Sequence, residues 1–188
     1  ITLFLDTKQW VEEDLQDRKK LKLLAQLFRK IHSLPKVGSP FEPKVIASNY
    51  FTNIHSRSEY VSYSKKCLTF IEQHGVTEAQ CCCHNDVVVS NIIGFKPLFI
   101  IDWEYASDNN PMFDIASLSC CHRLNKSQEQ TILDEYFDGH TKQQYEELVI
   151  QKYIYDAIYW LWLASRNVMS PDNKQVKLLF DIESRLGF

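Results

Sequence analysis

The segment NIIGFKPLFIIDWEY, residues 91–105, interrupts an otherwise helical pattern and most limits the folds open to this chain. Its two short apolar runs are separated by the residues GFKP, which is the pattern of a β-hairpin. Polar side chains stand at both ends of the segment, at Asn91 and Asp102. The sequence therefore predicts a small sheet inserted among helices, with polar groups brought together where the hairpin begins and ends.

Two amphipathic helices are predicted before the hairpin. Apolar residues recur at helical spacing through residues 17–34, and the proline that follows stops the pattern. Residues 33–44, SLPKVGSPFEPK, are expected to form a loop. A second apolar stripe over residues 60–71 predicts a helix that ends at Gly75.

Four more helices are predicted after the hairpin. Pro111 stands where a helix would have its first turn. The motifs SQEQ and TKQQ begin at Ser127 and Thr141, and each places a hydroxyl three residues before a glutamine, as in a capping box. A last helix is expected over residues 172–186. The predicted fold class is α+β and mainly helical.

Composition and charge exclude several classes of protein. The 188 residues are 45% hydrophobic, which is enough for one substantial core. A net charge of −3 gives no general affinity for nucleic acid or for acidic membranes. The most apolar helical stretch, AIYWLWLASRN, is too short to span a membrane, and no secretory signal opens the chain. Because most cysteines stand in two adjacent runs, which suits buried thiols, we predict a cytoplasmic protein without nucleic-acid or membrane partners.

The run CCCH, residues 81–84, raises the question of a metal site. Structural zinc ligands come in pairs two to four residues apart, and side chains alternate sides along a strand. Cys82 and His84 are therefore the pair expected to share a face. A second group, CCH at residues 120–122, keeps a zinc-binding protein open as a reading. Small buried thiols on a core strand are the favoured alternative.

A second pattern begins in the same stretch. His84, Asp86 and Asn91 fit HxDxxxxN, and Asp102 follows eleven residues after Asn91. Phosphoryl transfer needs an acid that orients the acceptor hydroxyl, and an amide and a carboxylate that hold magnesium on the nucleotide phosphates. Asp86, Asn91 and Asp102 match these needs in type and in order.

Two blocks of the sequence resemble the choline kinase and aminoglycoside phosphotransferase family of small-molecule kinases. CHNDVVVSNII, residues 83–93, resembles the catalytic loop of that family. IIDWEYASDNNPMFDIASL, residues 100–118, resembles the metal-binding segment that follows, with Pro111 and Asp114 matching its PxxDxA helix start. The resemblance implies a protein-kinase-like C-terminal lobe with a small catalytic β-hairpin, and ATP and Mg²⁺ as cofactors.

The resemblance also implies a role for each matching residue. Asp86 is expected to be the catalytic base or the acid that orients the acceptor hydroxyl. Asn91 and Asp102 are expected to ligate magnesium. His84 is expected to support the loop structurally, and Asp114 to fix it through hydrogen bonds. For Asp114, a plain charge at a helix N-terminus is the alternative.

The acceptor is expected to be choline or a related amino alcohol. DWEYA, which contains Glu104, is most like bacterial choline kinases and their thiamine-kinase-like relatives. Tyr155, Tyr159 and Trp162 fall at spacings that place them on one helical face, with Asp156 beside them. Aromatic faces hold quaternary ammonium groups, and a nearby carboxylate balances the charge.

The aromatic stripe has a second reading as part of the core. The resemblance implies that Tyr159 and Trp162 contribute to a choline pocket. Aromatic stripes on helices are nevertheless often buried, and Trp160 and Leu161 are expected to be core.

One part of the family pattern is missing from this sequence. Related kinases clasp the nucleotide with an N-terminal lobe, but the chain has five glycines, no glycine-rich phosphate loop and no strand-borne lysine before its first helix. Residues 1–10 are expected to be a hinge segment, with Phe4 and Leu5 meeting adenine, and residues 11–188 to be the C-terminal lobe. We therefore expect the N-terminal lobe to be absent, turnover to be poor, and self-association through the surface that lobe would cover.

Other functions stay open on the sequence alone. Thiamine or aminoglycoside phosphorylation would use the same catalytic residues with a different pocket. For a polycationic aminoglycoside, the last helix offers only the scattered carboxylates of Asp172, Asp181 and Glu183. A non-catalytic pseudokinase that binds choline fits the missing lobe, but it gives no reason to retain Asp86, Asn91 and Asp102 together.

Overall fold

The computed structural model describes residues 7–54, 58–75, 80–166 and 173–187. The chain divides into two compact units, residues 1–40 with 79–149, and residues 41–78 with 150–188. Each unit has its own cluster of buried apolar side chains. The predicted catalytic segment belongs to the first unit, and the predicted aromatic stripe to the second.

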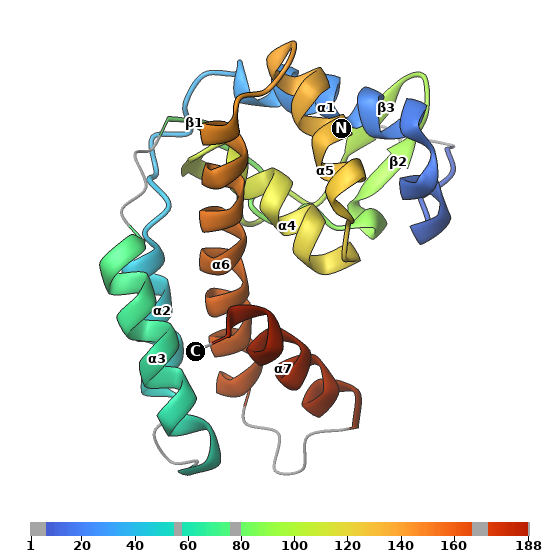
Figure 1. Ribbon diagram of the computed structural model, residues 1–188. Coiled ribbons are helices and arrows are strands. Elements are labelled where there is room, and N and C mark those ends of the chain that lie inside the picture. Colours follow the sequence, from blue (N-terminus) through green and yellow to red (C-terminus); the bar gives the residue numbers. More distant parts are fainter. Residues whose placement is uncertain (1–6, 55–57, 76–79, 167–172, 188) are drawn as a thin grey trace. The chain divides into compact units, whose positions relative to one another are not determined.

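The first unit combines helices with two short antiparallel sheets (Figure 1). Its elements are a 3-10 helix (Glu12–Gln16), α1 (Arg18–His32), β1 (Cys81–Cys83), a 3-10 turn (Val89–Asn91), β2 (Ile92–Gly94), β3 (Leu98–Ile100), β4 (Ser107–Asn109), α4 (Met112–His122), α5 (Lys126–Phe137) and the first part of α6 (Lys142–Ser165). Strand β1 pairs with β4, and β2 pairs with β3. The cysteine run is thus a short strand, with Cys82 and Cys83 buried and Cys81 partly buried.

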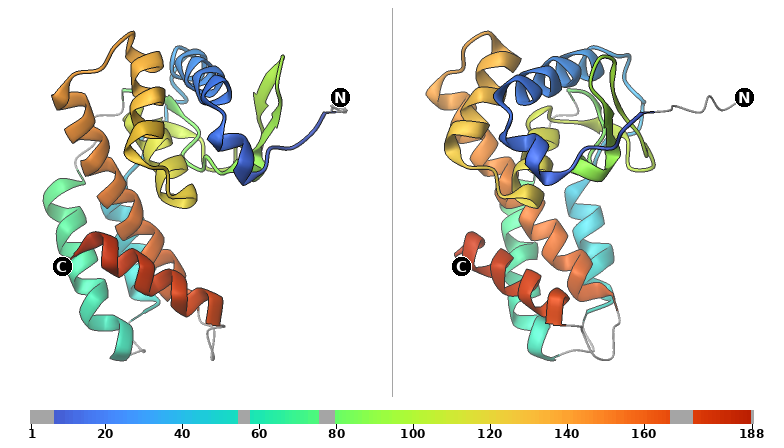
Figure 2. Two further views of the ribbon diagram at one scale, coloured as in Figure 1. Left: turned by 45° about the vertical axis from the view of Figure 1, so that its right-hand side comes forward. Right: turned by 90° about the vertical axis from the view of Figure 1, so that its right-hand side faces the viewer.

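The predicted hairpin is confirmed as β2 and β3, with Gly94 opposite Leu98. Gly94 has a φ of +79°, and a Cβ atom there would lie 2.4 Å from the carbonyl oxygen of Pro97. The turn therefore requires glycine at this position. The chain before α1 runs beside the hairpin (Figure 2), where the indole N–H of Trp10 donates to the carbonyl of Gly94 at 2.6 Å.

Helix α1 supports the first unit from one side. Asp17 caps its N-terminus by accepting the backbone N–H of Lys19 at 2.8 Å. The apolar face of the helix, which includes Leu24 and Phe28, is fully buried, and the helix contacts α5, β1 and β3. Burial of each such side chain is worth about 1.5–3 kcal/mol. The predicted helix over residues 17–34 is confirmed, and it ends at His32.

Helix α5 begins with a capping box, but not the predicted one. Asn125 Oδ1 accepts the backbone N–H of Gln128 at 3.1 Å, and Gln128 Oε1 accepts that of Asn125 at 2.8 Å. Ser127, the predicted cap, already lies inside the helix. The backbone N–H three residues after it therefore needs no capping by the Ser127 hydroxyl. The box predicted at Thr141 is confirmed, because Thr141 N donates to Gln144 Oε1 at 2.8 Å.

The second unit is helical throughout its described part. Its elements are α2 (Pro43–Thr52), α3 (Ser58–His74), the remainder of α6, and α7 (Asn173–Leu186). Residues 33–42 lie in the predicted loop, but α2 follows at Pro43, where no helix is predicted from the sequence. Helix α3 ends before Gly75 as predicted. No described helix is both long and apolar enough to cross a membrane.

Trp160 lies at the centre of the second unit. It is fully buried, as is Leu161, so both predictions of core positions are confirmed. The rings of Tyr60 and Tyr63 from α3 pack against the indole at centroid distances of 6.1 and 4.9 Å. The indole N–H donates to Glu183 Oε1 of α7 at 3.2 Å, so α3, α6 and α7 share one core.

Candidate active site

The predicted catalytic loop runs from the end of β1 to the start of β2. Asn85 has a φ of +65°, which turns the chain out of the strand. Its buried amide Nδ2 donates to the carbonyl of Tyr105 at 3.0 Å and to Ser107 Oγ at 2.8 Å. Its Oδ1 accepts from Asn109 Nδ2 at 2.8 Å. These bonds tie the loop to β4 and to the chain that precedes it.

Asp114 fixes the beginning of this loop. Its carboxylate is fully buried at the start of α4. Oδ2 accepts the backbone N–H of His84 at 3.0 Å, and Oδ1 accepts that of Asn85 at 2.7 Å. His32 Nε2 also lies 3.0 Å from Oδ2. Hydrogen bonds from charged acceptors are stronger than neutral ones, so this carboxylate holds the turn firmly.

Two further side chains of α4 hold the middle of the loop. Ser117 Oγ accepts the backbone N–H of Val87 at 3.0 Å and donates to the same residue's carbonyl. His122 Nε2 accepts the backbone N–H of Val89 at 2.9 Å. Because the backbone donors of an irregular segment need partners when buried, these contacts fix the course of the loop.

His84 links the loop to the segment that ends the hairpin. Its ring is fully buried. Nδ1 accepts the backbone N–H of Asp86 at 3.3 Å, and Nε2 donates to the carbonyl of Ile101 at 3.0 Å. Trp103 packs edge-on against the ring at a centroid distance of 4.9 Å. With both nitrogens bound to backbone, His84 has a positioning role.

Asp86, Asn91 and Asp102 come together at the ends of the hairpin. Asn91 Nδ2 donates to the carbonyl of Asp86 at 3.1 Å, and Asn91 O accepts the N–H of Ile101 at 2.9 Å. Burial raises the pKa of the Asp86 carboxyl, and the negative charge of Asp102 adds to this effect against an opposing influence of the His84 ring that is smaller than that of burial. The Asp86 and Asp102 carboxylates are thus within electrostatic reach of each other.

The donor set of Asn91 and Asp102 fits magnesium. Mg²⁺ prefers oxygen ligands and is bound in kinases by one or two protein groups together with phosphate oxygens. Because Nδ2 of Asn91 is bonded to the backbone, Oδ1 is the amide atom left to face a ligand. Asp102 is exposed and has a φ of +68°, a conformation that aspartate adopts more readily than most residues. A divalent cation would also offset the repulsion between the two carboxylates.

Glu104 lies in an exposed turn of the first unit, two residues after Asp102. The turn is anchored beside it, because the indole N–H of Trp103 donates to the carbonyl of Ile100 at 2.9 Å. Phe4 and Leu5, the residues expected to meet adenine, lie outside the described residues.

The aromatic stripe belongs to the second unit. The rings of Tyr155 and Tyr159 lie 5.9 Å apart, and those of Tyr159 and Trp162 are stacked at 5.6 Å. Tyr155 is buried, and the other two are partly exposed. The guanidinium of Arg166 lies 3.8 Å from the centre of the Trp162 ring, so this ring already supports a cation–π contact.

Asp156 does not have the expected role beside these rings. Its carboxylate is buried, and both oxygens are bound by Arg185 of α7, at 2.8 and 2.6 Å. The expectation that it balances the charge of a bound cation is therefore wrong. Arg185, which forms the ion pair with Asp156, comes from α7. The spacing of residues along α6 does not reveal this partner.

Residues 1–165 match the family described as choline/ethanolamine kinase. The chain belongs to this family. The predicted fold class is confirmed as a mainly helical, kinase-like fold with a small antiparallel sheet.

Proteins named LicA are similar to all or part of this chain. Protein LicA of Haemophilus influenzae is 32% identical in an alignment of 88 positions that covers 43% of this chain and 33% of that protein. The crystal structure of choline kinase LicA from Streptococcus pneumoniae has a TM-score of 0.79 at 23% identity, over 98% of this chain and 68% of that one. A structure of LicA in complex with AMP has a TM-score of 0.78 at 22% identity, over 98% and 67%. The chain thus spans a third of the curated relative that it matches.

Sequence reasoning missed several residues that hold the predicted catalytic loop of this choline/ethanolamine kinase family member. Ser117 stands three residues after Asp114, on the same face of α4, and this spacing was an available signal. Asn85 and His122 carried no comparable signal. His122 is bonded to the loop backbone at Val89, and Asn85 is bonded to the segment that contains β4, partners that only the folded chain brings to them.

Proposed function

We propose that the chain carries the acceptor and metal-binding part of a kinase that transfers the γ-phosphoryl group of ATP to the hydroxyl of choline or a related amino alcohol. The observation that carries this proposal is the convergence of Asp86, Asn91 and Asp102, on a loop held by α4, in a member of the choline/ethanolamine kinase family. The relatives named LicA, one of them a choline kinase and one bound to AMP, support choline and an adenine nucleotide as ligands.

In this proposal Asp86 accepts the proton of, or orients, the acceptor hydroxyl. Its raised pKa fits a group that must be ionised near neutral pH yet retain some basicity. Asn91 Oδ1 and the Asp102 carboxylate hold Mg²⁺, which neutralises charge on the phosphates when it is bound. His84 and Asp114 position the loop, because both are fully buried and bonded to its backbone.

Tyr155, Tyr159 and Trp162 of the second unit are proposed to recognise the cationic head group, and Glu104 of the first unit is proposed as a substrate-binding residue. The stacked Tyr159 and Trp162 rings provide the aromatic faces that a quaternary ammonium group prefers. The contact of Arg166 with Trp162 supports this assignment, because it is a cation–π contact on the same ring. Residues 1–10 are proposed as the hinge, with Phe4 and Leu5 beside adenine.

The proposal is tested by phosphorus NMR of the chain with choline and Mg²⁺–ATP, with the Asp86→Asn variant as control. We expect phosphocholine to form slowly and only when choline is present. The rate of phosphocholine formation by the variant should be at least about 100-fold lower, as expected for loss of a positioned acid–base group. Calorimetric titration with choline runs in parallel.

The outcomes separate the alternatives. Choline binding without phosphocholine above the Asp86→Asn level would replace the kinase by a choline-binding pseudokinase. Absence of both binding and transfer would contradict the proposed acceptor. Trp162→Ala is expected to weaken choline binding while leaving nucleotide binding unchanged, and an unchanged choline affinity would remove Trp162 from the pocket.

A further inference from the structure

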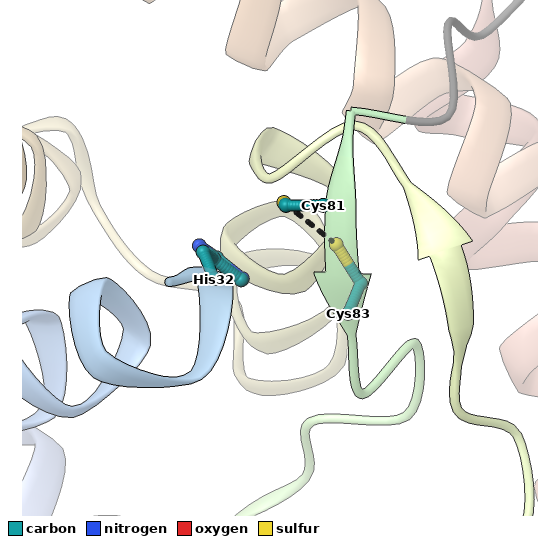
Figure 3. Close-up of side chains that lie close together, drawn as sticks. All are labelled: His32, Cys81 and Cys83. Atoms are coloured by element: carbon teal, nitrogen blue, oxygen red, sulfur yellow. Dashed lines mark hydrogen bonds between the residues drawn. The ribbon is translucent and has the colours of Figure 1, made fainter. Parts of the chain in front are cut away.

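Three side chains that the proposed kinase reaction does not use meet between α1 and β1. Cys81 and Cys83 project from the same face of β1, two residues apart, and their Sγ atoms lie 3.7 Å apart. His32, the last residue of α1, faces them (Figure 3). One ring nitrogen of His32 and the two sulfurs all lie within 4.8 Å of one another.

We propose that His32, Cys81 and Cys83 form a binding site for a thiophilic divalent cation, Zn²⁺ in the first instance. This site is separate from the magnesium site proposed at Asn91 and Asp102, which offers oxygen ligands only. Sulfur and imidazole nitrogen are ligands that zinc prefers and magnesium does not.

The spacing of the sulfurs suits tetrahedral coordination. With zinc–sulfur bonds of about 2.3 Å, two thiolates at a tetrahedral centre are about 3.8 Å apart. The observed Sγ–Sγ separation of 3.7 Å matches this value. A cation therefore requires small side-chain adjustments in β1 and a closer approach of the His32 ring.

The surroundings of His32 resemble those of a metal-ligating histidine. Its Nε2 lies 3.0 Å from Asp114 Oδ2, an oxygen that also accepts a backbone N–H. Nε2 therefore carries the proton, and Nδ1 keeps the lone pair that a cation requires. Metal-bound histidines commonly donate their other N–H to a carboxylate in this way, which orients the ring.

The hydroxyl of Tyr136 lies next to the fourth coordination position. It donates to His32 Nδ1 at 2.8 Å, and a cation on Nδ1 replaces this hydrogen bond and leaves the hydroxyl oxygen beside the metal. His32 and Tyr136 also line an open cavity of about 660 Å³, bordered by Gln26, Arg29, Lys30 and Ser33. This cavity gives a cation or a water molecule a route from solvent to the ring.

The exposure of the two cysteines gives a cation a way in. Cys81 is partly exposed and Cys83 is buried, so a cation reaches the pair from the side of Cys81. Binding releases the thiol protons, because the thiolate is the form that binds metals.

The geometry corrects the pairing expected from the sequence. Side chains do alternate along the strand, but β1 ends at Cys83, and the ring of His84 is bonded to the loop and to Ile101. Cys82 projects to the other face of β1 and is buried. His122, in the second cysteine group, is bonded to Val89 and to Glu12 instead.

The test is calorimetric titration of the full chain with Zn²⁺, in a phosphine reductant and excess Mg²⁺. We expect one zinc ion per chain. Cys81→Ser should weaken binding by at least about 100-fold, since loss of outer-sphere partners alone costs up to that factor. Cys82→Ala is the matched control, because it changes the adjacent cysteine on the opposite face and should leave zinc affinity unchanged.

Visible and near-ultraviolet spectra with Co²⁺ in place of Zn²⁺ provide a second readout on the unmodified chain. A thiolate-to-cobalt charge-transfer band and strong tetrahedral d–d bands are expected, and both should be lost in Cys81→Ser and kept in Cys82→Ala. Circular dichroism verifies the fold of each variant. Absence of stoichiometric zinc binding, absence of the thiolate band, or equal zinc affinity in Cys81→Ser would each overturn the proposal.

Discussion

At the scale of single residues, a buried carboxylate and a partly buried one have opposite effects on the first unit. Asp114 is satisfied by two backbone N–H groups and by His32, and it holds the proposed catalytic loop in place. Asp86 accepts none of these bonds through its side chain, and burial and the charge of Asp102 raise its pKa. The Asp114 carboxylate stabilises the fold, whereas the charge of the Asp86 carboxylate lowers its stability.

Asp114→Asn should destabilise the chain. An asparagine amide offers one acceptor oxygen where the carboxylate offers two, so at least one buried N–H of the loop loses its partner. The expected loss is about 1–3 kcal/mol in the free energy of unfolding, measured by urea denaturation. Asp138→Asn makes the same chemical change at an exposed position and should stay within about 0.5 kcal/mol of the unmodified chain. An equal effect of both substitutions would contradict the role given to Asp114.

Asp86→Asn should stabilise the chain at pH 7 when divalent cations are removed with EDTA. A carboxyl whose pKa is raised on folding favours the folded state below its ordinary pKa of 3.8, and this contribution is lost as the pH rises through the raised value. The substitution removes an unfavourable buried charge, so the urea midpoint should increase at pH 7 and the difference should vanish below pH 3.8. A lower midpoint at pH 7 would show that the Asp86 charge is stabilised by the fold.

At the scale of elements, helix α4 organises the site. Asp114, Ser117 and His122 bond successive parts of one loop, so the helix acts as a template for an irregular segment. The starts of α1, α5 and α6 are likewise set by side chains that satisfy unpaired N–H groups. At α5 this task falls to Asn125, one residue before the first helical residue.

Asn125→Ala and Ser127→Ala form a matched pair at the start of α5. The first substitution removes the capping side chain and should cost about 1 kcal/mol of unfolding free energy. The second removes an exposed hydroxyl inside the first turn and should change it by less than about 0.5 kcal/mol. Chemical denaturation of the two variants decides between the observed and the predicted cap. A larger loss of unfolding free energy in Ser127→Ala than in Asn125→Ala would make Ser127 the cap.

At the scale of the whole molecule, two cores divide the proposed work. The residues proposed for phosphoryl transfer lie in the unit of α1, α4 and α5, and the aromatic residues in the unit of α3, α6 and α7. Since each core is continuous by itself, a local defect in one unit should open that unit first.

Arg185→Ala should open the second unit selectively. It leaves the Asp156 carboxylate buried without its partner, and removing one member of a buried ion pair typically costs about 3–5 kcal/mol. Hydrogen exchange should accelerate in α7 and in the second half of α6, while α4 and α5 keep their protection. Lys142→Ala breaks the exposed pair with Glu146 and should change exchange little. Equal acceleration in α4 would show that the two units open together.

The sequence predicted the elements whose formation depends on local spacing. Helices α1, α3, α4 and α7 and the β2–β3 hairpin follow from apolar periodicity and from turn residues such as Gly94, and the cap at Thr141 follows from its motif. Helix α2 was missed because its short apolar pattern is weak. The cap of α5 was displaced by two residues, because two overlapping motifs compete for one helix start and the sequence does not say where the backbone becomes helical.

For the candidate site, the sequence by itself determined the chemical types at positions 86, 91 and 102 and their order. It also determined that positions 91 and 102 lie close together, because a short hairpin must bring its two ends together. Only the tertiary structure decided that Arg185 occupies Asp156, that α4 holds the loop, and that Cys81 and Cys83 face His32. These contacts join residues that are at least 29 positions apart in the chain. Such pairings depend on how helices and strands pack, and packing is set by the shape and burial of whole surfaces, which no local spacing in the chain records.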